Sequence, residues 1–253
     1  MNVILRDVLV VAGLLAALWL AMVVATRILR RPRKIGNSYV GELHDDTGIA
    51  GDGSVLSIQS AQVDMEASEL DAIWTPEHLE RLARTYWRFL SRCTLGLIRV
   101  VYDEEHRFVV LVGRPLTLLT FHSPEYLMDA ERGIVRWRIE RGLLVASRGT
   151  DADGYLEIDV ERSGSPKPGR ADLSVEVTVA NYYPRIAAAF TRWAYAATQS
   201  RIHVLVTYGF LKSLARFDLA PSRVGRFASI GEVPDPEGPG PGERRQGRAA
   251  PQP

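Results

Sequence analysis

The side chains that could do chemistry are scattered along the chain. The five histidines are His44, His78, His106, His122 and His203, and no two of them stand in His-x-x-x-His spacing. Structural zinc sites usually draw their ligands from closely spaced His and Cys pairs, so we expect no metal site. The sequence also has no nucleophile elbow, P-loop or dinucleotide fingerprint. We therefore expect neither a cofactor nor a catalytic residue.

The densest carboxylates belong to an alternating pattern. Glu157, Asp159 and Glu161 alternate with apolar residues, which places them on one face of a strand. Arg136 and Arg138 alternate with apolar residues in the same way in the segment 134–139. Opposite charges on neighbouring antiparallel strands stabilise the pairing by roughly 0.2–1 kcal/mol per pair. The pattern therefore favours two adjacent strands with a solvated outer face over a group of catalytic acids.

Polar and aromatic residues near strand ends and on the last predicted helix could line a pocket. The stretch "ANYYP" places an amide and two phenols directly before a predicted helix. The candidate ligand-binding residues are Trp137, His122, Tyr126, Asn181, Tyr182 and Trp193. In the alternative interpretation, Asn181 caps the helix and the aromatic side chains pack in the core or at its rim.

The periodicity of the central chain predicts the elements that position these residues. Helical spacing begins at Thr75, a suitable N-cap, with Pro76 at the first helical position and Arg81, Arg84, Arg88 and Arg92 on the solvated side. Period-two patterning then predicts strands within residues 95–102, 107–112, 115–121, 134–139, 155–161 and 172–179. A second helix is predicted from Pro184, and residues 201–217 fit a helix better than a strand. Cys93 is predicted to be a small packed side chain rather than a nucleophile.

An apolar run precedes a basic cluster near the start of the chain. Residues Val8–Thr26 carry no charge, and roughly 20 apolar residues suffice to cross the hydrocarbon core as a helix. Five basic residues follow: Arg27, Arg30, Arg31, Arg33 and Lys34. The positive-inside rule then predicts a single-pass cell-membrane protein with its N-terminus outside and its domain in the cytoplasm. A cleaved signal peptide and a buried core helix are the alternatives.

Composition divides the chain into four parts. Residues 1–34 form the predicted membrane anchor, 35–53 a Gly- and Asp-rich linker, 54–227 one α+β domain, and 228–253 a disordered Pro- and Gly-rich tail. Beyond residue 34, acidic side chains slightly outnumber basic ones, and no basic stripe with interleaved aromatic residues is present. Nucleic-acid binding is therefore disfavoured. The single cysteine suits a reducing compartment.

The order of one helix, a long antiparallel meander and a closing helix resembles the helix-grip fold of the START-like superfamily, which includes polyketide-cyclase-like and coenzyme-Q-binding-like proteins. The resemblance covers about residues 54–217. It implies an antiparallel sheet gripped by a long C-terminal helix, with an apolar cavity between them for a hydrophobic or lipid-like molecule. We therefore expect a membrane-anchored domain that binds such a ligand at the cytoplasmic face of the bilayer. A non-catalytic assembly protein whose tail docks protein partners is the alternative, and a cyclase- or hydrolase-like enzyme is the third.

Overall fold

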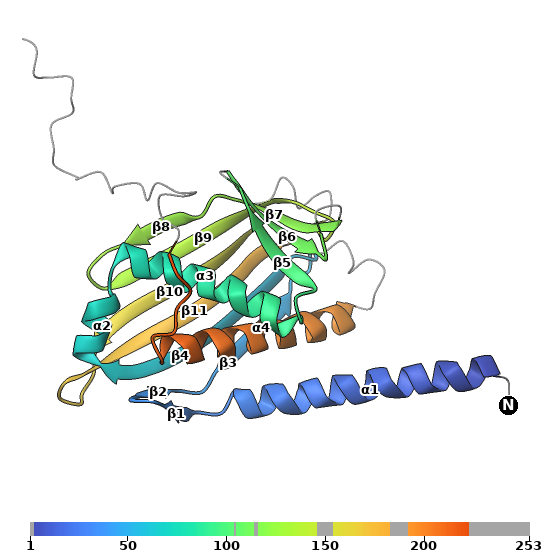
Figure 1. Cartoon of the computed structure of the whole chain (residues 1–253), viewed down its shortest axis with the longest axis horizontal. Coiled ribbons are helices and arrows are strands. Elements are labelled where there is room, and N and C mark those ends of the chain that lie inside the picture. Colours follow the sequence, from blue (N-terminus) through green and yellow to red (C-terminus); the bar gives the residue numbers. More distant parts are fainter. Residues whose placement is uncertain (1–2, 104, 114–115, 146–153, 183–191, 223–253) are drawn as a thin grey trace, which may run out of the picture.

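The computed structural model describes residues 3–103, 105–113, 116–145, 154–182 and 192–222 (Figure 1). The helices are α1 (Val3–Leu29), α2 (Ala67–Ile73), α3 (Pro76–Cys93) and α4 (Arg192–Leu214). The strands are β1 (Arg33–Ile35), β2 (Ser38–Val40), β3 (His44–Ile49), β4 (Val55–Glu66), β5 (Ile98–Tyr102), β6 (His106–Leu111), β7 (Thr117–His122), β8 (Glu125–Met128), β9 (Arg132–Arg141), β10 (Tyr155–Gly164) and β11 (Arg170–Tyr182). The predicted tail, residues 228–253, lies outside the described residues.

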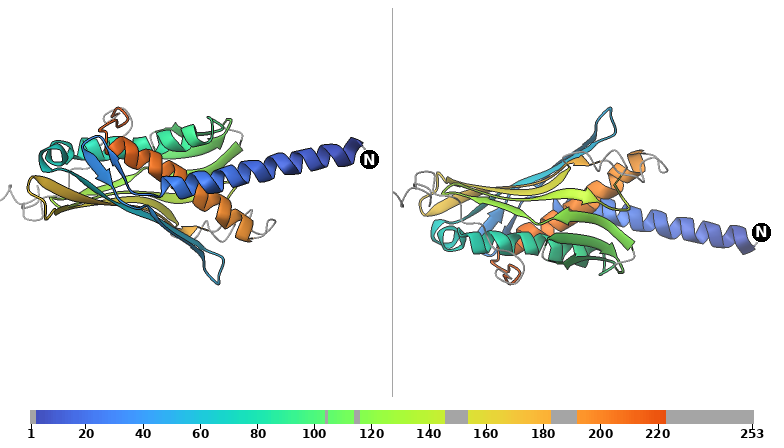
Figure 2. Two further views of the ribbon diagram at one scale, coloured as in Figure 1. Left: turned by 90° about the horizontal axis from the view of Figure 1, so that it is seen from below. Right: turned by 90° about the horizontal axis from the view of Figure 1, so that it is seen from above.

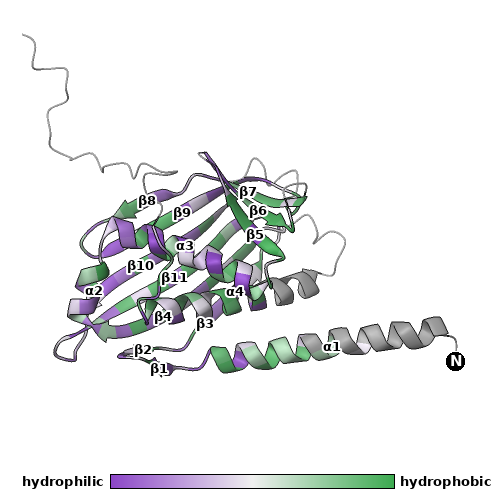
Figure 3. Cartoon of the chain, viewed as in Figure 1, coloured by the Kyte–Doolittle hydropathy of each residue, from purple (hydrophilic) through white to green (hydrophobic). Residues whose placement is uncertain are grey.

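The described strands form one antiparallel sheet that is covered on one face by helices. The strand order is β1-β2-β4-β11-β10-β9-β7-β6-β5, with β3 paired to β4 and β8 paired to β9. Helices α3 and α4 lie on the same side of this sheet (Figure 2). Apolar and polar residues alternate along the strands (Figure 3), so one face packs against the helices and the other faces outward. This helix-grip-like α+β arrangement is the one predicted from the element order.

The central strands β9, β10 and β11 agree closely with the sequence pattern. Strand β10 pairs with both neighbours, and Glu157 lies opposite Arg136 in the register. The Arg136 Nε donates to the Glu157 carboxylate at 2.5 Å, and Arg132 makes an ion pair with Asp159. The predicted adjacency of the basic and acidic outer faces is therefore confirmed.

Helix α3 begins where its capping residues predict. The Thr75 side chain accepts a hydrogen bond from the His78 backbone N–H, and Pro76 is the first helical residue. Its apolar positions, including Leu79 and Tyr86, are buried. The prediction that Cys93 is a packed side chain is wrong, because this last helical residue is exposed.

The sequence predicted that the basic residues of α3 face solvent, but most of them bond to another part of the chain. Three of these guanidinium groups donate to backbone carbonyls just after α4: Arg88 to Asp218 at 2.6 Å, Arg81 to Ala220 at 3.1 Å and Arg84 to Pro221 at 3.1 Å. The Thr85 hydroxyl accepts from the Ala220 backbone N–H at 2.8 Å. Residues 218–221 are thereby fastened along α3.

Helix α4 confirms that residues 201–214 are helical. The predicted start at Pro184 lies outside the described residues. Gly209 lets α4 approach α3 closely, because a Cβ at this position would lie 2.2 Å from the Phe89 ring.

The prediction that residues 35–53 form a linker is wrong, because they contribute to β1, β2 and β3. Strand β3 pairs along β4, and β2 pairs with the other end of β4. The alternation of apolar and polar residues did not reveal β4, because some of its polar side chains are buried and one of its apolar side chains is exposed. Ser57 and Gln59 point inward and are fully buried, whereas Leu56 on the other face is exposed.

The apolar run is helical in α1 as predicted. Helix α1 contacts α4, and the residues that directly follow α1 are bonded to the domain. Arg30 makes an ion pair with Asp45 of β3, and Arg33 donates to the Tyr208 hydroxyl of α4 at 2.8 Å. The expectation that a flexible linker holds the domain apart from this helix is therefore wrong. The other half of α1 extends away from the domain (Figure 2). Within the residues that the structure describes, no helix has both the length and the apolar character required to cross a membrane.

Candidate functional site

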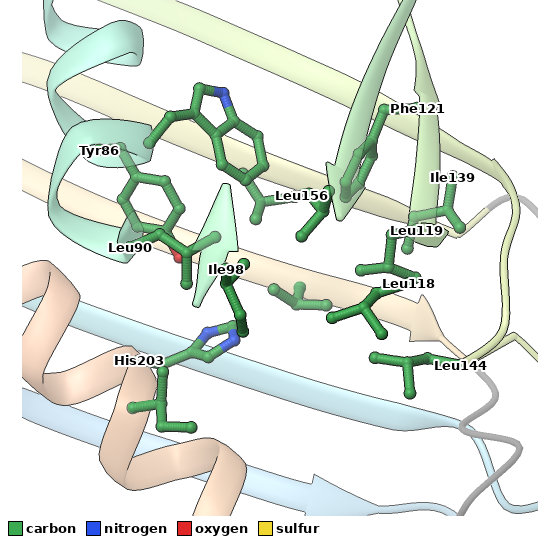
Figure 4. Close-up of a pocket in the computed structure, with 14 residues that line it drawn as sticks. Tyr86, Leu90, Ile98, Leu118, Leu119, Phe121, Ile139, Leu144, Leu156 and His203 are labelled. Atoms are coloured by element: carbon green, nitrogen blue, oxygen red, sulfur yellow. The ribbon is translucent and has the colours of Figure 1, made fainter. Parts of the chain in front are cut away.

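An apolar cavity of about 220 Å³ lies between the sheet and helices α3 and α4 (Figure 4). Helices α3 and α4 supply one side of its lining, and strands β5, β6, β7, β9, β10 and β11 supply the other. Its lining residues are Tyr86, Trp87, Leu90, Ile98, Val109, Leu118, Leu119, Phe121, Ile139, Leu144, Leu156, Val179, Ile202 and His203.

Two features bring the strand side chains to the cavity: successive side chains alternate between the faces of the sheet, and the register of β7 is irregular with both of its neighbours. Ile139 and Leu156 are inward positions of β9 and β10 and are buried. On β7 the pairing shifts on both sides, between Val109 and Val110 on β6 and between Thr120 and Phe121. Such bulges re-aim side chains, and the neighbours Leu118 and Leu119 both line the cavity.

Three polar side chains interrupt this apolar lining, and all come from the helices. Tyr86 and Trp87 lie on α3, and His203 lies on α4. Within the described part of the chain, the Trp87 Nε1 and the His203 Nδ1 are buried without a hydrogen-bond partner. Figure 4 shows Tyr86 and His203 on the same side of the cavity. A ligand that carries a polar atom could satisfy these groups.

Burial keeps the cavity uncharged at neutral pH. It lowers the pKa of His203 to about 4 and outweighs the opposing effect of the Asp45 carboxylate. Burial also raises the pKa of the Tyr86 hydroxyl above its ordinary value. A charged group costs free energy in such surroundings unless it is paired. The cavity therefore favours a neutral ligand or a neutral part of one.

Aromatic packing forms the rigid wall behind the cavity. The ring centroids of Trp87 lie 5.1 Å from those of Trp137 and 5.6 Å from those of Phe121. Tyr86 packs edge-on against Phe210 of α4 at 6.1 Å. Edge-to-face pairs contribute about 0.5–1.5 kcal/mol beyond their buried area, so α3 is held firmly against both the sheet and α4.

The residues that the sequence suggested for ligand binding do not gather at this cavity. Trp137 is buried directly behind Trp87 and does not line the cavity. His122 is exposed on the outer face of the sheet. Tyr126 of β8 is half-buried, and its pKa is raised by burial and by nearby Glu80, which the Arg107 guanidinium opposes. Asn181 is exposed at the end of β11 with a positive φ of 52°.

The last two suggested residues, Tyr182 and Trp193, have side chains outside the described part of the structure. The lining residues Trp87 and His203 were not predicted, because their positions in the sequence mark them less clearly as site residues. Trp87 follows a core position of α3, and His203 lies in the stretch that fitted both helix and strand. Only their position on two facing helices makes them part of one site.

Solved structures similar to this chain include two human START domains. STARD10 is 10% identical, with 67% of this chain and 76% of that chain covered and a TM-score of 0.22. The lipid transfer and protein localization domain of StarD13 is 10% identical, with 66% and 89% covered and a TM-score of 0.27. CalU16 from Micromonospora echinospora is 11% identical, with 69% and 96% covered and a TM-score of 0.21. No protein-family model and no curated protein matches the chain.

Proposed function

We propose that this chain binds a hydrophobic molecule in the cavity between α3, α4 and the sheet. The observation that carries the proposal is the apolar lining around about 220 Å³. An engineered apolar cavity of about 150 Å³ is large enough to bind benzene, so this cavity has room for a ring or a short acyl segment. Each methylene transferred from water into it contributes about 0.8 kcal/mol.

The polar atoms at the cavity narrow the class of ligand. The Trp87 Nε1–H can only donate a hydrogen bond, so it requires an acceptor oxygen. Neutral His203 can accept or donate, depending on its tautomer. We infer that the ligand carries a hydroxyl or carbonyl group on an otherwise apolar body. An anionic head group has no cationic partner among the described lining residues.

We propose further that the domain is anchored to the cytoplasmic face of the cell membrane through α1. The support lies in the uncharged run Val8–Thr26 and in the basic cluster that follows it. The hydrogen bond from Arg33 to Tyr208 supports a domain that stays close to such an anchor, because it ties the start of β1, four residues after α1, to α4. An anchored carrier of this kind could exchange its ligand with the bilayer.

The test uses the full-length chain purified in a mild detergent. Organic extraction followed by mass spectrometry should recover a neutral apolar molecule at no more than one per chain. A fluorescent apolar probe should bind with the same stoichiometry to chain from which the co-purified molecule has been removed. Leu119→Trp narrows the cavity and should abolish or strongly weaken probe binding. Leu127→Trp is the matched control, because Leu127 is 58% exposed on β8.

Equal probe binding by the unmutated chain and by Leu119→Trp would rule out the cavity as the ligand site. A cyclase- or hydrolase-like activity requires an acid and a base that converge on the ligand. The described lining residues include no carboxylate, so no observation favours that alternative. An assembly role for the tail stays a prediction from the sequence, because residues 228–253 lie outside the described residues.

A further inference from the structure

A second group of functional side chains lies on the outer face of the sheet. His106 of β6, His122 of β7 and Glu140 of β9 each offer one metal-ligating atom, and these atoms lie within 4.8 Å of one another. We propose that this His106–His122–Glu140 cluster binds a divalent transition metal ion, with Zn²⁺ as its simplest probe. The site is separate from the apolar cavity and does not depend on the proposed function.

The strand register builds the cluster from residues far apart in sequence. His106 and His122 are direct cross-strand partners in the β6–β7 pair. Strand β9 lies on the other side of β7, with Ile139 opposite Phe121. Phe121 and Ile139 line the cavity, and successive residues of a strand point to opposite faces. His122 therefore points outward with its partner His106. Glu140 is the extra residue of the irregularity between the Phe121–Ile139 and Thr120–Arg141 pairs, and its carboxylate lies beside the two imidazoles.

The donor set and its spacing suit a first-row metal ion. Two imidazoles and one carboxylate bind Zn²⁺ or Fe²⁺ and leave coordination positions for water or a substrate. The His106 Nε2 lies 3.2 Å from the Glu140 Oε2, close to the separation of about 3.3 Å that two ligands 2.0–2.1 Å from a tetrahedral metal require. The His106 and His122 ring centroids are 5.8 Å apart. His122 is exposed, so its ring is free to turn and close this gap.

Charged neighbours lie beside two of the three ligands. The Asp103 carboxylate lies 3.7 Å from the His106 Nδ1 and accepts the backbone N–H groups of Glu105 and His106. A carboxylate on this side favours the proton on Nδ1 and leaves Nε2 as the ligand. Arg141 pairs with the Glu140 Oε1 at 2.9 Å.

The other Glu140 oxygen is the atom that points to a ligand. Within the described residues, the Glu140 Oε2 is buried without a hydrogen-bond partner. This is the carboxylate oxygen nearest the His106 Nε2. The contact with the His106 Nε2 is an ion pair only when His106 is protonated, and a buried carboxylate oxygen without a partner is costly. A metal ion held between Glu140 and the two histidines would supply that partner.

The test measures metal binding by the untagged full-length chain after chelator treatment. Titration with Co²⁺, followed by its visible absorption, and calorimetric titration with Zn²⁺ should each show one site per chain. Asp103→Asn should weaken Zn²⁺ binding by less than about 10-fold, because its carboxylate lies 3.7 Å from the His106 Nδ1 and acts through charge alone. His106→Ala and His122→Ala should weaken it more. Zn²⁺ should also raise the thermal unfolding temperature of the unmutated chain and leave that of His122→Ala unchanged.

His44→Ala is the matched control, because His44 is an exposed histidine on another strand, β3. It should bind Zn²⁺ as tightly as the unmutated chain. His122→Ala separates binding from folding, since an exposed side chain can be shortened with little effect on stability. No saturable site in the unmutated chain, or an equal loss in His44→Ala and His122→Ala, would overturn the proposal.

Discussion

Trp87 of α3 and His203 of α4 line one apolar cavity from two helices, and each has a buried ring nitrogen that lacks a hydrogen-bond partner among the described residues. A buried polar group left without a partner costs about 1–3 kcal/mol. These two nitrogens therefore make the folded chain less stable than its packing alone would allow. Binding of an oxygen-bearing apolar ligand would recover part of that free energy.

Replacing His203 with leucine should therefore separate stability from ligand binding. His203→Leu removes the unpartnered nitrogen and leaves an apolar side chain of similar bulk. We expect the free energy of unfolding of the ligand-free chain to rise by about 1–2 kcal/mol and the affinity for a hydroxyl-bearing apolar probe to fall. Urea unfolding followed by circular dichroism and probe titration measure the two effects.

His44→Leu, at the exposed histidine of β3, should change the free energy of unfolding by less than about 0.5 kcal/mol. A marked loss of stability in His203→Leu would show that the His203 ring is satisfied in the folded chain.

Acid should destabilise the domain through the same residue. Burial lowers the pKa of His203 from its usual 6.5 to about 4, so the unfolded chain binds the proton more readily between these two values. Above about pH 6.5 the titration of His203 adds no cost to the stability of the domain, and this cost grows as the pH falls toward 4. The cost amounts to at most about 3 kcal/mol. Urea unfolding at a series of pH values measures it.

The comparison that isolates this effect is the difference between the unmutated chain and His203→Leu, since carboxylates titrate in both. That difference should be constant above about pH 6.5 and grow as the pH falls toward 4. A difference that does not vary with pH would exclude His203 as the source.

Gly209 should be essential for the contact between α3 and α4. A Cβ there would lie 2.2 Å from the Phe89 ring, so Gly209→Ala must push the helices apart or displace Phe89. We expect a loss of about 1–3 kcal/mol in the free energy of unfolding, despite the higher helix propensity of alanine. Gly164→Ala on β10 is the control, because a Cβ there meets no atom within 4 Å. Equal stability of the two variants would contradict the close packing.

The basic cluster should set the orientation of the chain in the membrane. A reporter fused after Arg226 should behave as cytoplasmic, because Lys and Arg close to a span determine its orientation. Neutralising all five residues, Arg27, Arg30, Arg31, Arg33 and Lys34, should give mixed or inverted insertion. An alkaline phosphatase fusion at this point that is active in the unmutated chain would refute the orientation.

The structure allows the two roles of this cluster to be separated. Arg30 and Arg33 contact the domain, whereas Arg27, Arg31 and Lys34 are exposed. Neutralising the three exposed residues should weaken the orientation bias without changing the stability of the domain. Replacing Arg30 and Arg33 should also make the segment between α1 and β2 more sensitive to limited proteolysis.

The elements that could be predicted from the sequence are those whose pattern and burial agree. Strands β9 to β11 alternate strictly, and α3 starts with a cap and a proline. Strand β4 could not be predicted because Ser57 and Gln59 point inward. Their side chains bond to each other, and the Gln59 amide also donates to Asp45. This polar network replaces the apolar contacts that a periodicity search detects.

The candidate site was harder to predict because its residues have no common spacing. Polarity at strand ends drew attention to His122 and Asn181, whereas the cavity is defined by inward apolar residues and by two helices that meet at Gly209. His203 became a lining residue only through the packing of α4. The outer-face histidines illustrate the same limit, since His106 and His122 are partners in the sheet register and unrelated in sequence spacing.

The fastening of residues 218–221 along α3 decides how the domain responds to a mechanical load. Tension on the chain beyond Ser222 does not unwind α4 from its end, because the hydrogen bonds from Arg81, Arg84 and Arg88 meet the load first. These arginines sit on the helix that carries Tyr86 and Trp87. Tension on this end of the chain would therefore reach the cavity wall first through α3.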